Sequence, residues 1–201
     1  MAGYPGIDTQ LSTWAINHLT ITICQINESN LSQINAVDGS FTVDARLVLS
    51  ARDGQISYTI EPVQPYIKRY PTEQFDWNTF IDNPDKALYL AYVDGQLASQ
   101  LAGQIILWKN WNHYGYIEDI AVDVNFRHQG IGRRLIEQAI TWARERGLPG
   151  LMLETQNNNL AACRLYESCG FHLGGFDQEL YRAIDPDTTE IALYWYLIFS
   201  A

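Results

Sequence analysis

The chain of 201 residues has few of the features that mark disulfide-rich or metal-binding proteins. Its three cysteines, Cys24, Cys163 and Cys169, are odd in number and lack Cys-x-x-Cys spacing, which disfavours a disulfide framework or a zinc site. Its four histidines are scattered along the sequence, so no metal site is predicted. The cysteines are instead expected to be small buried apolar residues.

Long apolar runs and positive charge are also scarce. No apolar run approaches the ~20 residues that cross a bilayer, and residues 1–19 do not have the layout of a signal peptide, so a cytoplasmic protein is expected. Lys and Arg number 13 against 23 Asp and Glu, which gives a net charge of −10. This balance disfavours nucleic acid as a partner and suits a cationic one, although an acidic surface also serves solubility.

What is present fits one α/β domain, with an apolar fraction of 47% that allows a sizeable core. Asp53-Gly54 and Asp94-Gly95 each lie between strand-like runs and predict two β-hairpins. Four prolines interrupt the aromatic-rich residues 61–84, which predicts an exposed loop and then a short helix begun by Thr72. The other segments with the residue pattern of strands are 19–26, 117–122, 150–156, 171–180 and 190–199.

The most informative stretch is 117–147, in which a strand leads through a glycine-bearing turn into a helix. In the turn 127–132, Gly130 and Gly132 allow successive backbone N–H groups to line a concavity that attracts phosphate oxygens. An amphipathic helix follows and is expected to end at Gly147. The positive end of its dipole points back at the turn and adds to the attraction for an anion.

The glycine spacing separates this turn from other phosphate-binding loops. A dinucleotide fingerprint needs a third glycine where this chain has Leu135, and a Walker loop needs Gly-Lys-Ser or Gly-Lys-Thr. The pattern Arg127-x-x-Gly130-x-Gly132, after a strand and before a helix, resembles the acyl-CoA pyrophosphate loop of the GNAT superfamily of N-acyltransferases. A glycine turn that serves only to start the helix is the alternative.

A second segment, within a predicted helix over 157–169, strengthens this resemblance. GNAT enzymes have a similar Asn-x-x-Ala-x-x-x-Tyr-x-x-x-Gly-Phe pattern, and this chain matches it with Asn159, Ala162, Tyr166, Gly170 and Phe171. Over about residues 20–199 the likeness is to the streptothricin acetyltransferases, which acetylate an amine of the β-lysine arm of that antibiotic.

The resemblance implies the GNAT fold, an α/β (α+β) arrangement. Its sheet is mixed and mostly antiparallel, with a central parallel strand pair splayed around acetyl-CoA. Residues 20–201 would form this single domain, and residues 1–19 would be an N-terminal extension.

The resemblance also implies where acetyl-CoA binds. Backbone amides of residues 127–133 would cradle the pyrophosphate, with the side chains of Arg127 and Arg133 as charge partners. The backbone of residues 120–122 would guide the pantetheine arm and polarise the thioester carbonyl, where a donor can contribute roughly 3 kcal/mol. Asn159 would bond to the pantetheine or the pyrophosphate. The predicted cofactor-binding residues are Ile120, Ala121, Val122, Arg127, His128, Gln129, Gly130, Ile131, Gly132, Arg133, Asn159 and Ala162.

Two adjacent carboxylates, Glu118 and Asp119, lie inside the predicted strand, where alternation would place one on each face. A buried carboxylate costs free energy unless it is paired or used, and an ion pair with Arg46 or Arg164 is one explanation. The functional hypothesis makes Glu118 the general base that deprotonates the bound substrate ammonium, while Asp119 holds the cationic substrate. The reverse order is open. Tyr166 is the predicted general acid that protonates the departing CoA thiolate.

Three further residues, Asp177, Glu179 and Tyr194, are weaker candidates for substrate contacts, with plain surface or core roles as the alternative. The expected activity is acetyl-CoA-dependent N-acetylation of a cationic small molecule, streptothricin first, with a polyamine, an aminoglycoside or a protein N-terminus as other acceptors. A non-catalytic acyl-CoA-binding sensor is the rival class, and it would not need Glu118 and Tyr166. No nucleic-acid or membrane partner is expected, and the sequence is compatible with a homodimer.

Overall fold

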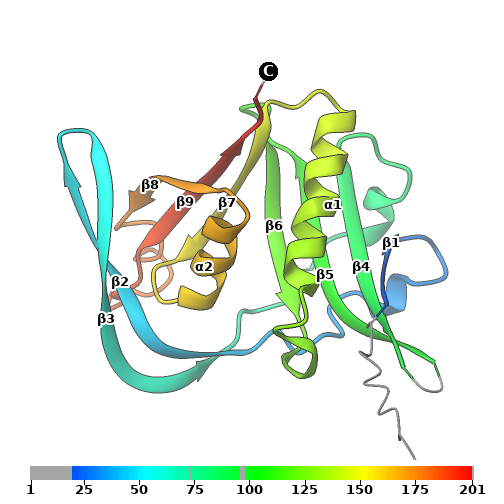
Figure 1. The fold of residues 1–201 in the computed structure, drawn as a ribbon, viewed down its shortest axis with the longest axis horizontal. Coiled ribbons are helices and arrows are strands. Elements are labelled where there is room, and N and C mark those ends of the chain that lie inside the picture. Colours follow the sequence, from blue (N-terminus) through cyan, green and yellow to red (C-terminus); the bar gives the residue numbers. More distant parts are fainter. Residues whose placement is uncertain (1–19, 73, 96–97, 201) are drawn as a thin grey trace, which may run out of the picture.

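The computed structural model describes residues 20–72, 74–95 and 98–200, and the predicted extension 1–19 lies outside them. In this part of the chain, one sheet has the strand order β1-β4-β5-β6-β7-β9-β8, and β2 and β3 form a second sheet (Figure 1). The strands are β1 (Ile21–Gln25), β2 (Phe41–Arg52), β3 (Gln55–Lys68), β4 (Lys86–Asp94), β5 (Ser99–Lys109), β6 (Gly115–Val122), β7 (Gly150–Gln156), β8 (His172–Asp177) and β9 (Ala192–Ile198).

Two α-helices, α1 (Ile131–Glu145) and α2 (Leu160–Ser168), lie on the same side of the large sheet, one over each half (Figure 1). Short 3-10 helices occur at Leu31–Gln33, Trp77–Phe80 and Val124–Phe126. None of the helices in the described residues is long and apolar enough to cross a membrane.

The central strands confirm the predicted mixed sheet. The neighbouring pairs of the large sheet are antiparallel except for β6 and β7, which run parallel. Within the described chain, β6 and β7 pair only from Gly115 opposite Leu151 to Ile117 opposite Leu153. Beyond Ile117 the two strands separate, as Figure 1 shows toward the lower end of β6. The fold is therefore a mixed, mostly antiparallel sheet with a splayed central parallel pair.

The main core lies between the helices and the large sheet. The apolar stripe of α1 packs on Ile105, Leu107 and Ile117, all of them almost fully buried. Burying one large aliphatic or aromatic side chain contributes roughly 1.5–3 kcal/mol, so this stripe holds α1 firmly on β5 and β6. The buried residues of α1 are Ile131, Leu135, Ile136, Ala139, Trp142 and Ala143. A smaller core around Ile106 and Phe80 lies on the opposite face of the sheet.

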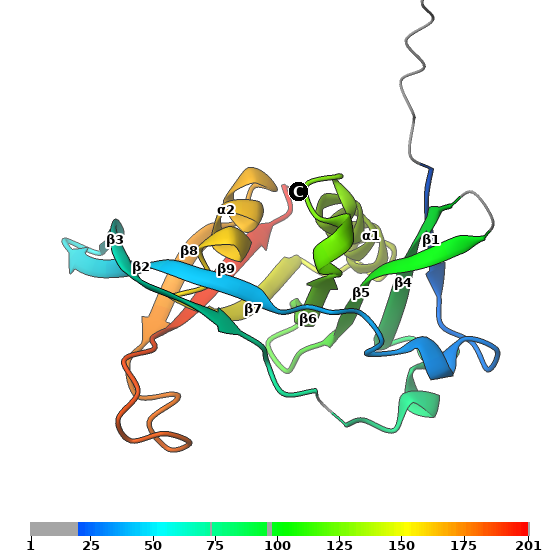
Figure 2. The same cartoon turned by 90° about the horizontal axis from the view of Figure 1, so that it is seen from below.

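The first predicted hairpin is present as a long arm made of β2 and β3. Its turn residues Asp53 and Gly54 both have positive φ, 52° and 75°, which is the backbone that Asp-Gly turns between twisted strands require. The arm crosses the lower end of the β7-β9-β8 half of the large sheet (Figure 2). The Tyr58 hydroxyl donates a hydrogen bond to Glu167 of α2, which fixes the arm to the helix.

Two predictions for residues 61–84 are wrong. β3 continues through Pro62 and Pro65 to Lys68, where a loop was expected. Prolines are tolerated there because β3 pairs with β2 alone, and the pairing register shifts opposite them, between Val43 and Ala45. The short helix begins at Trp77 rather than Thr72.

Asp76 is the capping residue of that short helix, because its side chain accepts a hydrogen bond from Asn78 N at 3.2 Å. The cysteine prediction holds in part. Cys163 is buried and Cys169 partly buried, but Cys24, on the outermost strand β1 of the large sheet, is exposed.

Candidate active site

The glycine turn has the backbone geometry that an anion-binding loop requires. Gly130 is the N-cap residue of α1 with a φ of +83°, and no side chain caps the helix. The first-turn N–H groups of α1 are therefore free of a side-chain acceptor. A Cβ atom on Gly132 would lie 2.9 Å from Leu165 Cδ2 of α2, so a larger residue here would require the Leu165 side chain to shift. These features fit the predicted pyrophosphate cradle.

The two arginines of this region contact the protein itself. Arg127 donates from Nε to the carbonyl of Val122 at 3.2 Å and from Nη2 to that of Ser40 at 2.7 Å. Arg133 Nη2 donates to the carbonyl and the hydroxyl of Ser168, at 3.1 and 3.0 Å, and so ties α1 to α2. Their role as charge partners of a pyrophosphate stays a prediction.

The predicted rail for the pantetheine arm lies where β6 has separated from β7. Ile120 and Val122 pair with Ile105 and Gly103 of β5 on one edge. Within the described residues, their other edge has no strand-to-strand pairing with β7. This edge is open to an extended ligand, which fits the predicted role of residues 120–122.

A β-bulge in β6 sets the direction of the adjacent carboxylates. Ile117 pairs with Leu107 and Asp119 pairs with Ile106, so Glu118 is the inserted residue of the bulge. Ile117 faces the helices, whereas Asp119 shares the opposite face with Ile106. The prediction that Glu118 and Asp119 divide between the two faces is therefore wrong, because it assumed unbroken alternation. Both carboxylates therefore lie on the face of the sheet away from the helices.

Asp119 is tied into a buried polar network. Gln104, only 2% exposed, donates from Nε2 to Asp119 Oδ2 at 2.7 Å and to Asn35 Oδ1 at 2.8 Å. Burial raises the pKa of Asp119, and the bond from Gln104 partly offsets this rise. Arg46, one suggested ionic partner, instead pairs with Glu61 at 3.4 Å. The substrate-binding role of Asp119 stays a prediction.

Sequence reasoning missed Glu154, which is the counterpart of Glu118 across the splay. The last parallel pair is Ile117 with Leu153, and the two glutamates directly follow it. Leu153 faces the helices, so Glu154 lies on the opposite face, where it pairs with Tyr194 of β9. We call Glu118 and Glu154 the carboxylate pair. An acidic residue at the end of an otherwise apolar strand was the available sequence signal.

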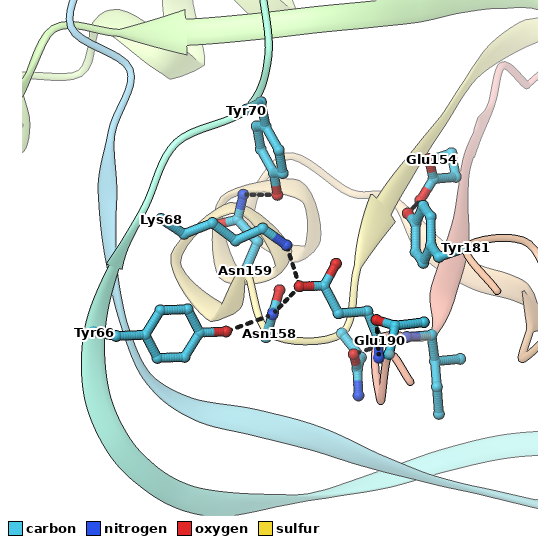
Figure 3. Close-up of polar contacts among 11 residues, drawn as sticks. Tyr66, Lys68, Tyr70, Glu154, Asn158, Asn159, Tyr181 and Glu190 are labelled. Atoms are coloured by element: carbon cyan, nitrogen blue, oxygen red, sulfur yellow. Dashed lines mark hydrogen bonds and ion pairs between the residues drawn. The ribbon is translucent and has the colours of Figure 1, made fainter. Parts of the chain in front are cut away.

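Both members of the carboxylate pair affect the pKa of Tyr116. Burial raises the pKa of the Tyr116 hydroxyl, and the charges of Glu118 and Glu154 raise it further. Burial also raises the pKa of Glu154, against the effects of the Tyr181 hydroxyl that donates to it and of the Lys68 charge (Figure 3). Two carboxylates acting on one point make this face of the splay attractive to a cation.

Tyr166 lies on α2 and packs its ring against Phe171 and Trp195, at centroid distances of 5.9 and 6.2 Å. Burial raises its pKa well above 10.0, and the charges of Asp119 and Glu154 are among the smaller contributions. These carboxylates belong to β6 and β7, the two strands of the splay. It keeps its proton at neutral pH, as a general acid must.

Consecutive asparagines after β7 join the arm to the site. Leu47 N donates to the Asn157 carbonyl at 2.8 Å, and Asn157 Nδ2 donates to the Leu47 carbonyl at 2.9 Å. Asn158 Nδ2 donates to the Tyr66 hydroxyl and to Glu190 Oε1, both at 3.0 Å (Figure 3). The sequence did not predict these contacts, because they join residues up to 110 positions apart.

Asn159 is the N-cap residue of α2. Its Oδ1 accepts from Ala162 N at 3.3 Å, and its Nδ2 donates to the Tyr70 hydroxyl at 3.2 Å. Close by, Lys68 forms an ion pair with Glu190 (Figure 3). Residues at the end of the arm therefore lie against the start of α2. The predicted roles of Asn159 and Ala162 in binding acetyl-CoA stay predictions.

The weaker candidates divide between two places. Tyr194 lies beside Glu154, and burial followed by the charge of Asp177 raises its pKa. Asp177, at the end of β8, accepts from the Glu179 backbone N–H at 2.8 Å. Glu179 pairs with Arg182 at 3.2 Å. The structure therefore brings Tyr194 and Asp177 toward the carboxylate pair, while Glu179 has an exposed partner of its own.

The splayed parallel strand pair and the glycine turn at the N-terminus of α1 fit the predicted acetyltransferase fold. The comparison with family models agrees, because residues 52–171 match the Acetyltransferase (GNAT) family. The chain belongs to the GNAT family and is an N-acetyltransferase. This confirms the predicted fold and enzyme class.

The relatives of this chain include named acetyltransferases. Streptothricin acetyltransferase A of Bacillus subtilis is 35% identical over 178 residues, which are 88% of this chain and 99% of the relative. A Bacillus anthracis protein assigned as a streptothricin acetyltransferase, solved with acetyl coenzyme A, is 44% identical. It superposes with a TM-score of 0.82 and covers 92% of this chain and all of its own. Nourseothricin acetyltransferase superposes at 0.73 with 33% identity, covering 89% and 98%.

Proposed function

We propose that this enzyme transfers the acetyl group of acetyl-CoA to an amine of streptothricin and so confers resistance to that antibiotic. The observation that carries the proposal is the carboxylate pair, Glu118 and Glu154, at the mouth of the splay. It supplies the negative field that a cationic amine acceptor needs. The similarity to streptothricin acetyltransferases over most of the chain supports the choice of acceptor.

Acetyl-CoA would supply an acyl thioester at the splay. The residues that would hold it are the backbone amides of 127–133 and the open edge of residues 120–122. Both features fit such a group, because the helix N-terminus has no side-chain cap and the strand edge has no partner strand in the described chain. Gly132 of α1 lies against Leu165 of α2, so the two helices approach each other beside the glycine turn.

The chain's own residues manage the protons of the reaction. Burial raises the pKa of Glu154, while the Tyr181 hydrogen bond and the Lys68 charge act against this rise, and we assign Glu154 to hold the substrate ammonium. Glu118, across the splay, accepts the proton of that ammonium, directly or through water. The Tyr166 hydroxyl, protonated at neutral pH, is the proton source for the leaving thiolate.

The test is acetyl-CoA turnover, followed as free thiol release, with streptothricin as acceptor and a panel of polyamines and aminoglycosides beside it. Saturable release with streptothricin at a lower KM than with the panel supports the proposal. Release with another amine only keeps the acetyltransferase and overturns the antibiotic. Tight acetyl-CoA binding without release with any acceptor would favour a sensor.

A further inference from the structure

An open cavity of about 470 Å³ lies on the sheet face away from the helices, beside the carboxylate pair. Aromatic side chains make most of its wall, and they come from β5, β6, β9 and the segment between β5 and β6. They are Trp108, Trp111, Tyr116, Tyr194 and Tyr196. This volume falls in the usual range for small-molecule sites, ~300–1,000 Å³. Nothing in the proton-transfer chemistry above uses this cavity.

The cavity is continuous with the reaction centre along two strands. On β6, Tyr116 in the cavity wall lies two residues before Glu118. On β9, Tyr194 in the wall is the direct partner of Glu154. Two residues along a strand span about 7 Å, so a ligand of that length could reach from the cavity to the carboxylates.

The chemistry of the wall selects for a cation. None of the described residues that line it carries a charge, while Glu118, Glu154 and Asp177 lie near enough to act on Tyr116 and Tyr194. Aromatic faces attract positive charge through the negative faces of their rings, and carboxylates around them add to this attraction. A neutral ring would gain nothing from the surrounding carboxylates.

The cavity also has polar groups that favour a flat cation. The side-chain amides of Asn110 and Asn112 lie against Met152, with Nδ2 to Sδ distances of 3.5 and 3.1 Å. Their carbonyl groups can accept hydrogen bonds from planar N–H donors. A delocalised planar cation stacks on aromatic rings and presents several donors in one plane. A compact ammonium has neither the flat face nor the coplanar donors.

We propose that this cavity binds a second cationic group of the acceptor, a flat cation of the guanidinium class, while the amine to be acetylated lies at Glu118 and Glu154. The inference rests on the proposed function and makes it more specific. The enzyme would then prefer acceptors that carry two cations about 7 Å or more apart. A simple monoamine would meet the carboxylate pair but leave the cavity empty.

Calorimetric binding to the enzyme loaded with CoA tests this without requiring turnover. The probes are agmatine, which joins an amine to a guanidinium through four methylenes, 1,4-diaminobutane and butylamine. We expect agmatine to bind at least about fivefold more tightly than butylamine, with 1,4-diaminobutane between them. Equal binding of agmatine and butylamine would overturn the inference.

Trp111 is the most suitable residue to change, because it is 87% exposed and its loss should not unfold the protein. Trp111→Leu should weaken agmatine binding about fivefold or more and leave butylamine unchanged, whereas Trp111→Phe should retain most of the affinity. Tyr194→Leu gives a second test inside the wall. Ile184→Ala, 84% exposed and outside the cavity, is the control. Agmatine affinity that is unchanged in both Trp111→Leu and Tyr194→Leu contradicts the inference.

The two proposals fail separately. If agmatine binds preferentially through Trp111 but streptothricin is not acetylated, the cavity stands as a cation site and the antibiotic is the wrong acceptor. If streptothricin is acetylated with the same KM by wild type, Trp111→Leu and Tyr194→Leu, the function stands and the cavity does not contribute.

Discussion

The two sides of the splay are built in different ways. The donor side, which we define as residues 117–147, is one continuous strand, turn and helix whose parts touch their neighbours in the sequence. The proposed acceptor side takes Trp111, Glu154, Tyr181 and Tyr194 from separate segments. Changes in one segment of the acceptor side should therefore leave the local structure of the donor side intact.

The largest effect is expected at Tyr166, which both sides share. Tyr166→Phe removes the proton source for the leaving group, so turnover should fall about 100-fold while acetyl-CoA affinity stays unchanged. Steady-state thiol release and acetyl-CoA calorimetry measure the two quantities. Tyr58→Phe, which removes a hydroxyl that bonds to Glu167 beside Tyr166, is the control for a looser α2 and should keep most of the turnover. Unchanged turnover in Tyr166→Phe would end the assignment.

The carboxylate pair separates the roles of its two members. Glu118→Gln should lose rate at neutral pH and recover part of it at higher pH, where more of the amine is already neutral. Glu154→Gln should instead raise the acceptor KM about 10- to 100-fold, because a charged hydrogen bond to the ammonium is lost. Neither change should alter the KM for acetyl-CoA. Rate–pH profiles with the acceptor varied distinguish the two roles, and exchanged profiles would reverse them.

The ion pair of the arm tests whether that arm belongs to the acceptor side. The side chains of Lys68 and Glu190 are 16% and 26% exposed. Lys68→Met should therefore lower the free energy of unfolding by about 1–2 kcal/mol and raise the acceptor KM, without changing that for acetyl-CoA. Arg69→Met, which breaks the exposed pair with Asp38, should leave the free energy of unfolding nearly unchanged. Chemical denaturation of both variants checks this, and equal losses would contradict it.

The smallest effect is a pH-dependent change at Asp119. Burial raises the pKa of this carboxyl above its value in the unfolded chain, so the folded state loses stability as pH rises through the raised pKa. Asp119→Asn removes that loss and can still accept the hydrogen bond from Gln104 Nε2. The variant should match wild type near pH 4 and have the higher melting temperature at pH 7. A lower melting temperature at pH 7 would mean that the charge is stabilised in the fold.

The sequence predicted the donor side well because its structure follows from local rules. The glycine turn, the start of α1 at Ile131 and its end before Gly147 depend on residues next to one another. The Asp-Gly turns also predicted both hairpins and the strands that they join. The bulge at Glu118 could not be predicted, because it depends on the register with β5, which alternation within β6 does not reveal.

The acceptor side was predicted poorly for a related reason. Glu154 gains its position only when β7 splays from β6, and Trp111 joins the cavity only through the packing of β5, β6 and β9. The prolines of β3 indicated a loop because their tolerance in a strand paired on one side depends on topology. Tyr194 was found among weak candidates, but its partner Glu154 was not.

The most direct test of the central claim is the mass spectrum of streptothricin after incubation with the enzyme and acetyl-CoA. We predict the addition of one acetyl group, located by fragmentation on the β-lysine arm. The Tyr166→Phe variant should form far less of this product over the same period. Unmodified antibiotic with active enzyme would contradict the proposed function, and an acetyl group on another part of the molecule would contradict the expected β-lysine acceptor.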